Sequence, residues 1–259
     1  MTDVPIRPAA TVMLVRDGNA GPEVYMLRRV AEMTFAGGMT AFPGGGVDAR
    51  DAAPIGWSGP GPSWWAAKFG IDVDLARRVV SAAVRELFEE TGVLLADLPA
   101  GSPGFTAAGL EAFRLQIAGH RAGLDALVGT GKVRADLLRP WARWVTPPGQ
   151  PRRYDTFFLL ALPPEGASPR MLTSEAETGE WIRPPDALEA AARGEIAMMP
   201  PTVAMLGSLA AIGSAAAMLT TDRDIRTVEA TVVSAPGEPM RVRAGDDEFA
   251  ALGLPISRS

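Results

Sequence analysis

The sequence predicts an α+β protein, and three observations indicate this class. Two β-rich runs, residues 9–16 and 23–30, flank a segment dense in turn-forming residues. A long helical pattern then ends at Gly92, and glycine is a common residue just past the end of a helix. The second half of the chain carries further β-rich runs and further helical segments.

The first half of the chain predicts three strands and an insertion. The two β-rich runs predict a hairpin whose turn lies in residues 17–22. Residues 39–42 predict a short third strand, and we expect a loop at 44–46, because three consecutive glycines leave the backbone free. Residues 51–70 are rich in Pro, Gly, Trp and Ala without a clear period, so we expect an ordered surface insertion there.

The helix that ends at Thr91 has the clearest signal. Asp72 or Asp74 can cap its start, and Gly92 stands at the usual terminating position. Each helical residue turns about 100°, so side chains at offsets i, i+3 and i+4 share a face. One face therefore carries three carboxylates, those of Glu86, Glu89 and Glu90. The opposite face is apolar and can pack on a sheet, with Val80, Val84, Leu87 and Phe88.

The later elements complete the expected domain. They are a helical zone at 107–123, strands at 142–146, 154–162 and 179–183, helices at 185–193 and 202–219, and a final hairpin made of 227–234 and 240–244. We expect one domain over residues 1–259, in which 52–71 are an insertion and 200–259 are a C-terminal extension packed on the domain.

Composition excludes several classes of function. A formal charge of -5 and a pI near 5.1 give no basic field for a nucleic-acid polymer. The chain has no cysteine, so thiolate metal sites and cysteine nucleophiles are excluded. The first residues lack the pattern of a secretory signal, and the apolar stretch 203–219 is shorter than the roughly 20 residues that span a bilayer. We expect a cytoplasmic protein that does not enter membranes.

The three helix glutamates predict a cation site. Unpaired carboxylates this close repel one another and disfavour the helix, so a positive partner is expected. Hard oxygen ligands suit Mg²⁺ or Mn²⁺, which keep several waters and bridge to substrate phosphates. The alternative is a solvated acidic face, and for an isolated pattern of this kind that alternative is the commoner one.

The sequence around these glutamates resembles the Nudix box. Residues 42–48 read Phe-Pro-Gly-Gly-Gly-Val-Asp, and residues 85–93 read Arg-Glu-Leu-Phe-Glu-Glu-Thr-Gly-Val. The box has a Gly, five residues, Glu, seven residues, and then Arg-Glu-apolar-any-Glu-Glu-any-Gly-apolar, and the second half matches at every specified position. With Gly45 at the first position, Asp51 replaces the Glu and 33 residues separate it from Arg85, so the box carries an insertion of 26 residues.

The resemblance implies a fold and a site. Nudix hydrolases have a mixed β-sheet sandwiched between α-helices, and here an additional C-terminal helix and hairpin would follow. The expected metal ligands are Glu86, Glu89, Glu90 and the main-chain carbonyl of Gly44. The expected structural residues are Gly45, Asp51, Arg85 and Gly92, with the guanidinium of Arg85 paired with Asp51 or with a helix carboxylate.

The resemblance also implies the chemistry, which is hydrolysis of a diphosphate linkage in a nucleoside diphosphate bonded to another group. A water activated by the metal would attack one phosphorus in line. The base would be a carboxylate, either a helix glutamate or a glutamate of a later loop. Glu175 is the candidate in that loop, which is equally consistent with a solvated acidic segment.

Interrupted boxes resemble one branch of the family, the coenzyme A diphosphatases. The segments 144–147, 152–158 and 198–202 are similar to that branch. Arg29 and Gly38 stand at the branch's distances from Phe42, whereas Thr34 and Val30 depart from its upstream pattern. The favoured substrate is thus coenzyme A or acyl-CoA. The alternatives are ADP-ribose, a dinucleotide, or nucleotide binding without catalysis by a sensor.

Several other side chains are candidates for substrate binding or for packing. Arg29 is a candidate substrate contact, and Arg152 and Arg153 either hold a substrate phosphate or carboxylate or form an exposed hairpin tip. Three tryptophans either stack on the substrate or pack the insertion, namely Trp57, Trp64 and Trp65. The single histidine, His120, is expected to have no catalytic role. The C-terminal extension is a candidate homodimer interface.

Overall fold

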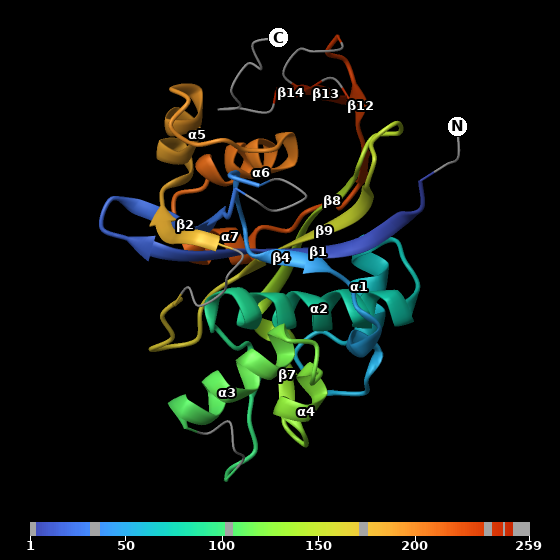
Figure 1. Ribbon diagram of the computed structural model, residues 1–259, viewed down its shortest axis with the longest axis vertical. Helices are drawn as coiled ribbons and strands as arrows, with labels where there is room; N and C mark the ends of the chain where they lie inside the picture. The colour runs from blue at the N-terminus through green and yellow to red at the C-terminus, as the bar shows by residue number, and fades with distance from the viewer. Residues whose placement is uncertain are drawn as a thin grey trace.

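An eight-stranded mixed sheet crosses the centre of the molecule (Figure 1). The computed structural model describes residues 4–31, 37–101, 106–170, 176–235, 240–245 and 247–250. The strands follow the order β10 (Ala176–Ile182), β2 (Gly21–Arg29), β1 (Ile6–Gly18), β9 (Arg153–Ala161), β8 (Leu138–Val145) and β11 (Thr227–Glu229). Strand β1 runs parallel to β9, and β11 runs parallel to β8, while the other neighbours are antiparallel.

The N-terminal strands confirm the predicted hairpin and correct the predicted loop. Strands β1 and β2 pair up to Gly18 and Gly21, so the turn is shorter than the expected one. Strand β3 (Thr40–Ala41) pairs with β2. The expectation of a loop at 44–46 was wrong, because these glycines form strand β4 (Gly44–Gly46), whose backbone pairs with residues 9–11 of β1.

Helix α2 (Val73–Thr91) confirms the central prediction of the sequence. The Asp72 side chain accepts a hydrogen bond from the Leu75 N–H at 2.8 Å, and Gly92 ends the helix in a left-handed conformation with a φ of 72°. The apolar face lies against the sheet, where Val80, Val84, Leu87 and Phe88 are buried. The position of this face fixes the direction in which the three glutamates project.

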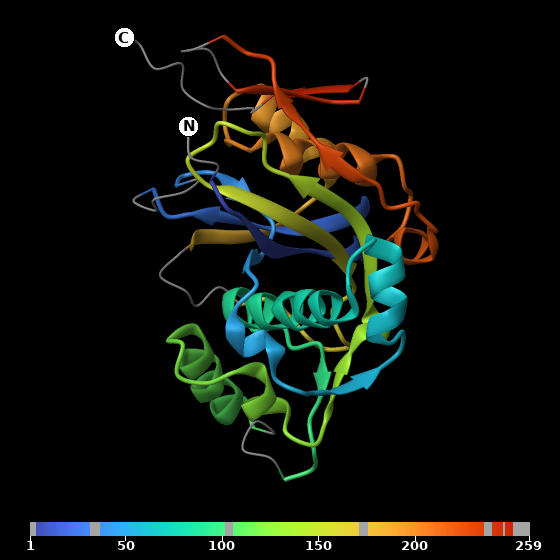
Figure 2. The ribbon, with the colours of Figure 1, turned by 90° about the vertical axis from the view of Figure 1, so that its right-hand side faces the viewer.

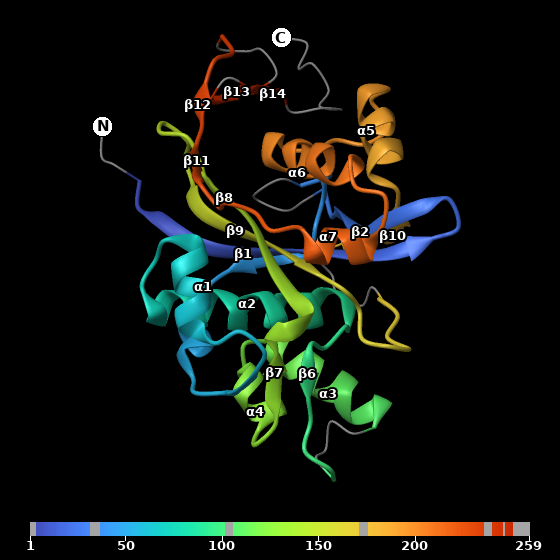
Figure 3. The same ribbon diagram turned by 180° about the vertical axis from the view of Figure 1, so that it is seen from behind.

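The layer that contains α2 holds the elements of the insertion and the middle of the chain (Figures 1 and 3). Its helices are η1 (Ala49–Ala52), α1 (Pro62–Phe69), α3 (Ala107–Ala118), α4 (Leu124–Val128) and η3 (Ala135–Leu137). A small sheet joins β5 (Gly56–Ser58), β7 (Lys132–Arg134) and β6 (Ala96–Asp97). The predicted helical zone at 107–123 corresponds to α3, which ends earlier than expected, at Ala118.

The opposite face of the sheet carries α5 (Pro184–Ala192), α6 (Pro200–Ala210) and α7 (Ala215–Thr220), as the side view in Figure 2 shows. The single helix expected at 202–219 was wrong, because the chain turns at Ile212 and Ser214 then caps α7 by accepting a hydrogen bond from the Ala217 N–H. These helices share a core with Met13 and Val24 of the sheet. Among the described residues, no helix is both long and apolar enough to cross a membrane.

The C-terminal strands extend this second layer. Strands β12 (Thr231–Val232) and β13 (Arg241–Ala244) confirm the predicted hairpin only in part, because residues 227–229 of its expected first strand form β11 and pair with β8 of the central sheet. Residues 236–239, between the two strands, lie outside the described residues. A further strand, β14 (Asp247–Ala250), pairs with β13. The rings of Trp144 in β8 and Phe249 in β14 lie 5.8 Å apart, edge to face. This contact joins the three-stranded sheet of β12, β13 and β14 to the central sheet.

The insertion is more than a surface segment. Helix α1 was not predicted, because eight residues are too few to show a clear period. Its Trp65 is fully buried, stacked on Phe69, and donates a hydrogen bond from its indole N–H to the Pro60 carbonyl at 2.9 Å. Trp64 is 37% exposed. The insertion therefore contributes to the core next to α2.

Replacement of Trp65 by alanine should lower the free energy of unfolding by about 3–5 kcal/mol, because it removes a large buried ring and leaves a cavity. Chemical denaturation followed by circular dichroism measures this difference. The neighbouring Trp64→Ala variant is the control and should lose much less. Equal effects of the two changes would mean that α1 does not pack as the structure shows.

Candidate active site

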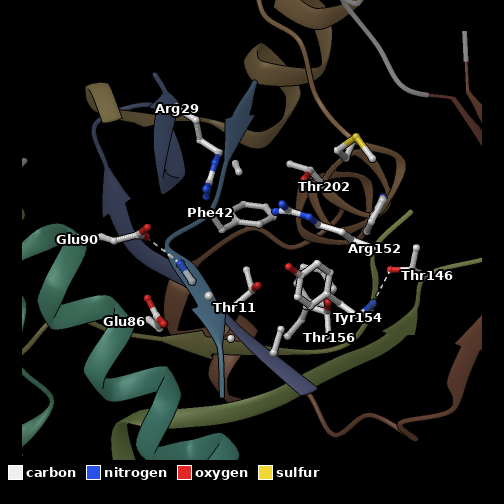
Figure 4. A pocket seen from close by; sticks show the side chains of 18 of the residues that line it. Thr11, Arg29, Phe42, Glu86, Glu90, Thr146, Arg152, Tyr154, Thr156 and Thr202 are labelled. Atoms are coloured by element: carbon white, nitrogen blue, oxygen red, sulfur yellow. Dashed lines mark hydrogen bonds between the residues drawn. The ribbon is translucent and has the colours of Figure 1, made fainter. Parts of the chain in front are cut away.

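A cavity of about 800 Å³ opens between α2, the central sheet and the start of α6. Its floor is the polar part of the sheet, formed by Thr11 of β1 with Tyr154 and Thr156 of β9. In Figure 4, Glu86 and Glu90 lie on one side of this floor, and Arg152 and Thr146 lie on the other. The cavity thus has an acidic end, and Arg152 lies on the opposite side of it (Figure 4).

The acidic end consists of the three glutamates at the C-terminal end of α2. The side chains of Glu86 and Glu89 are each 13% exposed, and Glu90 is buried. All three line the cavity, so the spacing in the sequence does place them on one surface. They lie together because the apolar face of the same helix is fixed on the sheet.

Arg85 holds the acidic end to strand β4 and helix η1, which precede it in sequence. Its Nε and Nη2 donate to the two carboxylate oxygens of Asp51 at 2.8 and 2.9 Å, and Nη2 also donates to the Gly46 carbonyl at 2.9 Å. Its Nη1 donates to Glu86 at 2.8 Å and to Glu89 at 3.1 Å. One guanidinium therefore contacts both kinds of partner that the sequence offered, Asp51 and the helix carboxylates.

Asp51 is itself held in place by the turn that precedes η1. The Asp48 N–H donates to Oδ2 of Asp51 at 2.7 Å, and the Asp48 side chain accepts from the Arg50 N–H at 2.8 Å. Both Asp51 and Arg85 are almost completely buried. A buried carboxylate with three donors fixes the position of the guanidinium.

Burial and neighbouring charges have opposing effects on the pKa of each ionisable group at this end. Burial raises the pKa of Glu86 to about 7, and the charge of Arg85 offsets this only in part. Burial acts to lower the pKa of Arg85, but the hydrogen bonds to Asp51 and the charges of Glu86, Asp51 and Glu89 raise it overall. Arg85 thus stays charged, while the pKa of Glu86 stays raised because the positive charge of Arg85 does not fully offset the effect of burial.

The glycine-rich segment makes close contacts that a side chain would prevent. The Gly44 N–H donates to Oε2 of Glu90 at 2.8 Å. A Cβ atom on Gly45 would lie 2.5 Å from Oε1 of Glu86, and one on Gly44 would lie 2.5 Å from the Ala10 carbonyl oxygen. At Gly46 a Cβ atom would meet nothing within 4 Å. Glycine is therefore required at Gly44, where a side chain would meet backbone, whereas a side chain at Gly45 would force the Glu86 carboxylate to move.

The donors at the acidic end suit a hard divalent cation in an open site. In the described residues, no group of three or more acidic or histidine side chains converges closely enough to enclose an ion. Mg²⁺ needs no such cage, because it is usually held by one or two carboxylates and keeps waters or substrate phosphates as its other ligands. The glutamates line one cavity and present oxygen donors, so they fit that type of binding.

The structure divides the other predicted residues between the cavity and its surroundings. Arg29 and Arg152 line the cavity, whereas Arg153 lines a separate hollow beside it. The Nε atom of Arg29 is buried and has no hydrogen-bond partner in the described residues. The three insertion tryptophans are not among the lining residues. Glu175 lies outside the described residues, so its place relative to the cavity is not assigned.

Several lining residues were not anticipated from the sequence. Arg114 of α3 is almost completely buried at the cavity, and its Nε donates to the main-chain carbonyl of Glu89 at 2.8 Å. His120 lines the cavity with a φ of 56°, and its Nδ1 lies 2.6 Å from Nη2 of Arg50. The only sequence signal that could have indicated a buried role for Arg114 is its position as a charged residue within a mostly apolar helical segment.

A family model described as the NUDT19 Nudix domain matches residues 63–209, more than half of the chain. The chain belongs to the Nudix hydrolase family. It is thus an enzyme of this hydrolase family, whose members generally use divalent metals. The matched range includes α2 and its glutamates, while Asp51 and the glycines of β4 lie before its start.

Two curated relatives are similar over most of the chain. The putative nudix hydrolase 7 of Caenorhabditis elegans is 31% identical over 210 residues, which cover 80% of this chain and 61% of that protein. The acyl-coenzyme A diphosphatase NUDT19 of Gallus gallus is 30% identical, with 75% of this chain and 65% of that protein covered. The chain thus spans less than two thirds of the length of these relatives.

The fold is similar to a solved Nudix structure. The crystal structure of a Nudix hydrolase from Alicyclobacillus acidocaldarius superposes with a TM-score of 0.66 and 29% sequence identity. The match covers 85% of this chain and 98% of that chain. The expectation of a Nudix-type mixed sheet between helices is therefore confirmed.

Replacement of Asp51 by alanine should lower the free energy of unfolding by about 3 kcal/mol, because it leaves the buried Arg85 without its carboxylate partner in η1. Denaturant unfolding measures the loss. The Asp74→Ala variant is a matched control, since Asp74 pairs with Arg77 and Arg78 at the exposed start of the same helix. A loss no greater than that of the control would contradict this role of Asp51.

Proposed function

We propose that the chain catalyses the Mg²⁺-dependent hydrolysis of a diphosphate linkage in a nucleoside diphosphate joined to another group, with coenzyme A or acyl-CoA as the favoured substrate. The observation that carries the proposal is the shared cavity, in which three helix glutamates lie opposite Arg152 (Figure 4), while Arg29 lines the same cavity with an Nε atom that has no partner in the described residues. Mn²⁺ is the alternative metal, because it accepts the same oxygen ligands.

The metal would be held by Glu86, Glu89 and Glu90, with the main-chain carbonyl of Gly44. When bound, the cation supplies positive charge that polarises the diphosphate and activates water for in-line attack. Arg85 orients Glu86 and Glu89 through its hydrogen bonds, and Gly44 orients Glu90. Asp51, Gly45 and Gly92 support this arrangement without contacting the substrate.

The arginines bind the substrate in this proposal. The Nε–H of Arg29, which has no partner in the described residues, is available to a phosphate oxygen. Arg152 enters the cavity from the side opposite the glutamates (Figure 4). The proton acceptor for the attacking water is a carboxylate, and the candidates remain the helix glutamates and Glu175.

The apolar part of the cavity supports a substrate with a long arm. Phe42, Trp144 and Met199 line it together with Met240 and Val242 of the C-terminal segment. A surface of this kind suits the pantetheine and acyl part of acyl-CoA, because burial of CH₂ groups is favourable by about 0.8 kcal/mol each. The similarity of the chain to the acyl-coenzyme A diphosphatase NUDT19 of Gallus gallus supports the same class of substrate.

Incubation with Mg²⁺ and coenzyme A should yield 4′-phosphopantetheine and adenosine 3′,5′-bisphosphate, which chromatography resolves. The Glu89→Gln and Glu90→Gln variants should lose activity by at least about 100-fold, because each removes a carboxylate ligand of the cation that would stabilise the charge developing on the diphosphate. ADP-ribose and a dinucleotide serve as comparison substrates. Cleavage of only these two would replace the favoured substrate, and full activity of both variants would refute the metal role of these residues.

Replacement of Gly45 by alanine should reduce the rate of hydrolysis at least about tenfold, because the new Cβ atom would displace the Glu86 carboxylate from the cavity. The Gly46→Ala variant is the matched control, since its Cβ atom meets nothing within 4 Å. Steady-state kinetics at several Mg²⁺ concentrations compare the two. Similar rates for both variants would show that close packing at Gly45 is irrelevant to activity.

A further inference from the structure

A second hollow of about 370 Å³ lies beside the main cavity, at the open end of the β1 and β9 pair. It is lined by Val4, Pro5, Arg7, Pro151, Arg152, Arg153 and Tyr154. Pro151, Arg152 and Tyr154 also line the main cavity. The two spaces are therefore adjacent.

The strand register places this hollow on the continuation of the cavity floor. Arg7 is paired with Tyr154 in the parallel ladder of β1 and β9. Alternate residues of a strand share one face, so Arg7 lies on the same face of β1 as Ala9 and Thr11, which line the main cavity. Arg7 and Thr11 are four positions apart, or about 13 Å at a rise of roughly 3.3 Å per residue. A substrate that reaches from the glutamates along the floor approaches Arg7.

The charge of the hollow favours an anion. Three of its seven described lining residues are arginines, and none of the seven is acidic. The guanidinium groups of Arg7 and Arg152 have no hydrogen-bond or ion-pair partner in the described part of the chain, whereas most other arginines of this acidic protein pair with a carboxylate. Guanidinium groups close together repel unless an anion lies between them, and phosphate accepts paired hydrogen bonds from them.

We propose that this hollow is a second phosphate subsite, which binds a phosphomonoester that the substrate carries at a distance from the diphosphate under attack. The inference rests on the proposed function and makes it more specific. A phosphomonoester carries nearly two negative charges near neutral pH. The subsite therefore selects nucleotides with an additional ribose phosphate over the same nucleotides without it.

The test compares coenzyme A with its 3′-dephospho form in the Arg7→Gln variant, because Arg7 lines only the outer hollow. The ratio of kcat/KM for coenzyme A to kcat/KM for 3′-dephospho-coenzyme A should fall about tenfold, mainly through the KM for coenzyme A. Arg226→Gln is the charge-matched control, since Arg226 is exposed and pairs with Asp224 on another part of the surface. The control should leave the ratio unchanged.

A ratio that is unchanged in Arg7→Gln, or a similar fall in the control, would overturn the subsite. Binding gives a readout that does not depend on hydrolysis. Adenosine 3′,5′-bisphosphate should bind the unmodified protein more tightly than AMP in calorimetry, and Arg7→Gln should remove that difference. If the unmodified protein cleaves neither form of coenzyme A, the proposed substrate fails, and the calorimetric comparison still decides whether the hollow binds a second phosphate.

Discussion

The buried pair of Arg85 and Asp51 is the contact on which the rest of the site depends. It joins two segments that the insertion separates in sequence, the turn after β4 and the second half of α2. The same guanidinium reaches Glu86, Glu89 and the Gly46 carbonyl. Because a planar guanidinium has donors in fixed directions, these partners cannot move independently of one another.

This contact explains why the glycines and the glutamates form one surface. Strand β4 is held on one side by its pairing with β1 and on the other by Arg85 and Glu90. Its backbone therefore approaches α2 so closely that a side chain at Gly45 would collide with Glu86. The glycines of the motif are thus explained by the short distance between strand β4 and helix α2.

The sequence predicted the parts of the fold that local patterns determine. The caps of α2 and the common face of its glutamates follow from residue spacing within 19 residues. It did not predict the burial of Trp65 or the break between α6 and α7, because tertiary packing decides both. The contacts of Arg114, Met240 and Val242 with the cavity join segments distant in sequence, and no spacing within one element encodes them.

The insertion lies between Asp51 and Arg85, so their contact can keep the site together whatever the length of the segment between them. The cost of closing a flexible loop grows with the logarithm of its length, so 33 residues between Asp51 and Arg85 in place of 7 add only about 1.4 kcal/mol. Much of the insertion is folded as β5 and α1, and the burial of Trp65 and Phe69 offsets that cost. Since Arg85 and Asp51 restore the original contact at its ends, the box can lengthen without displacing the glutamates.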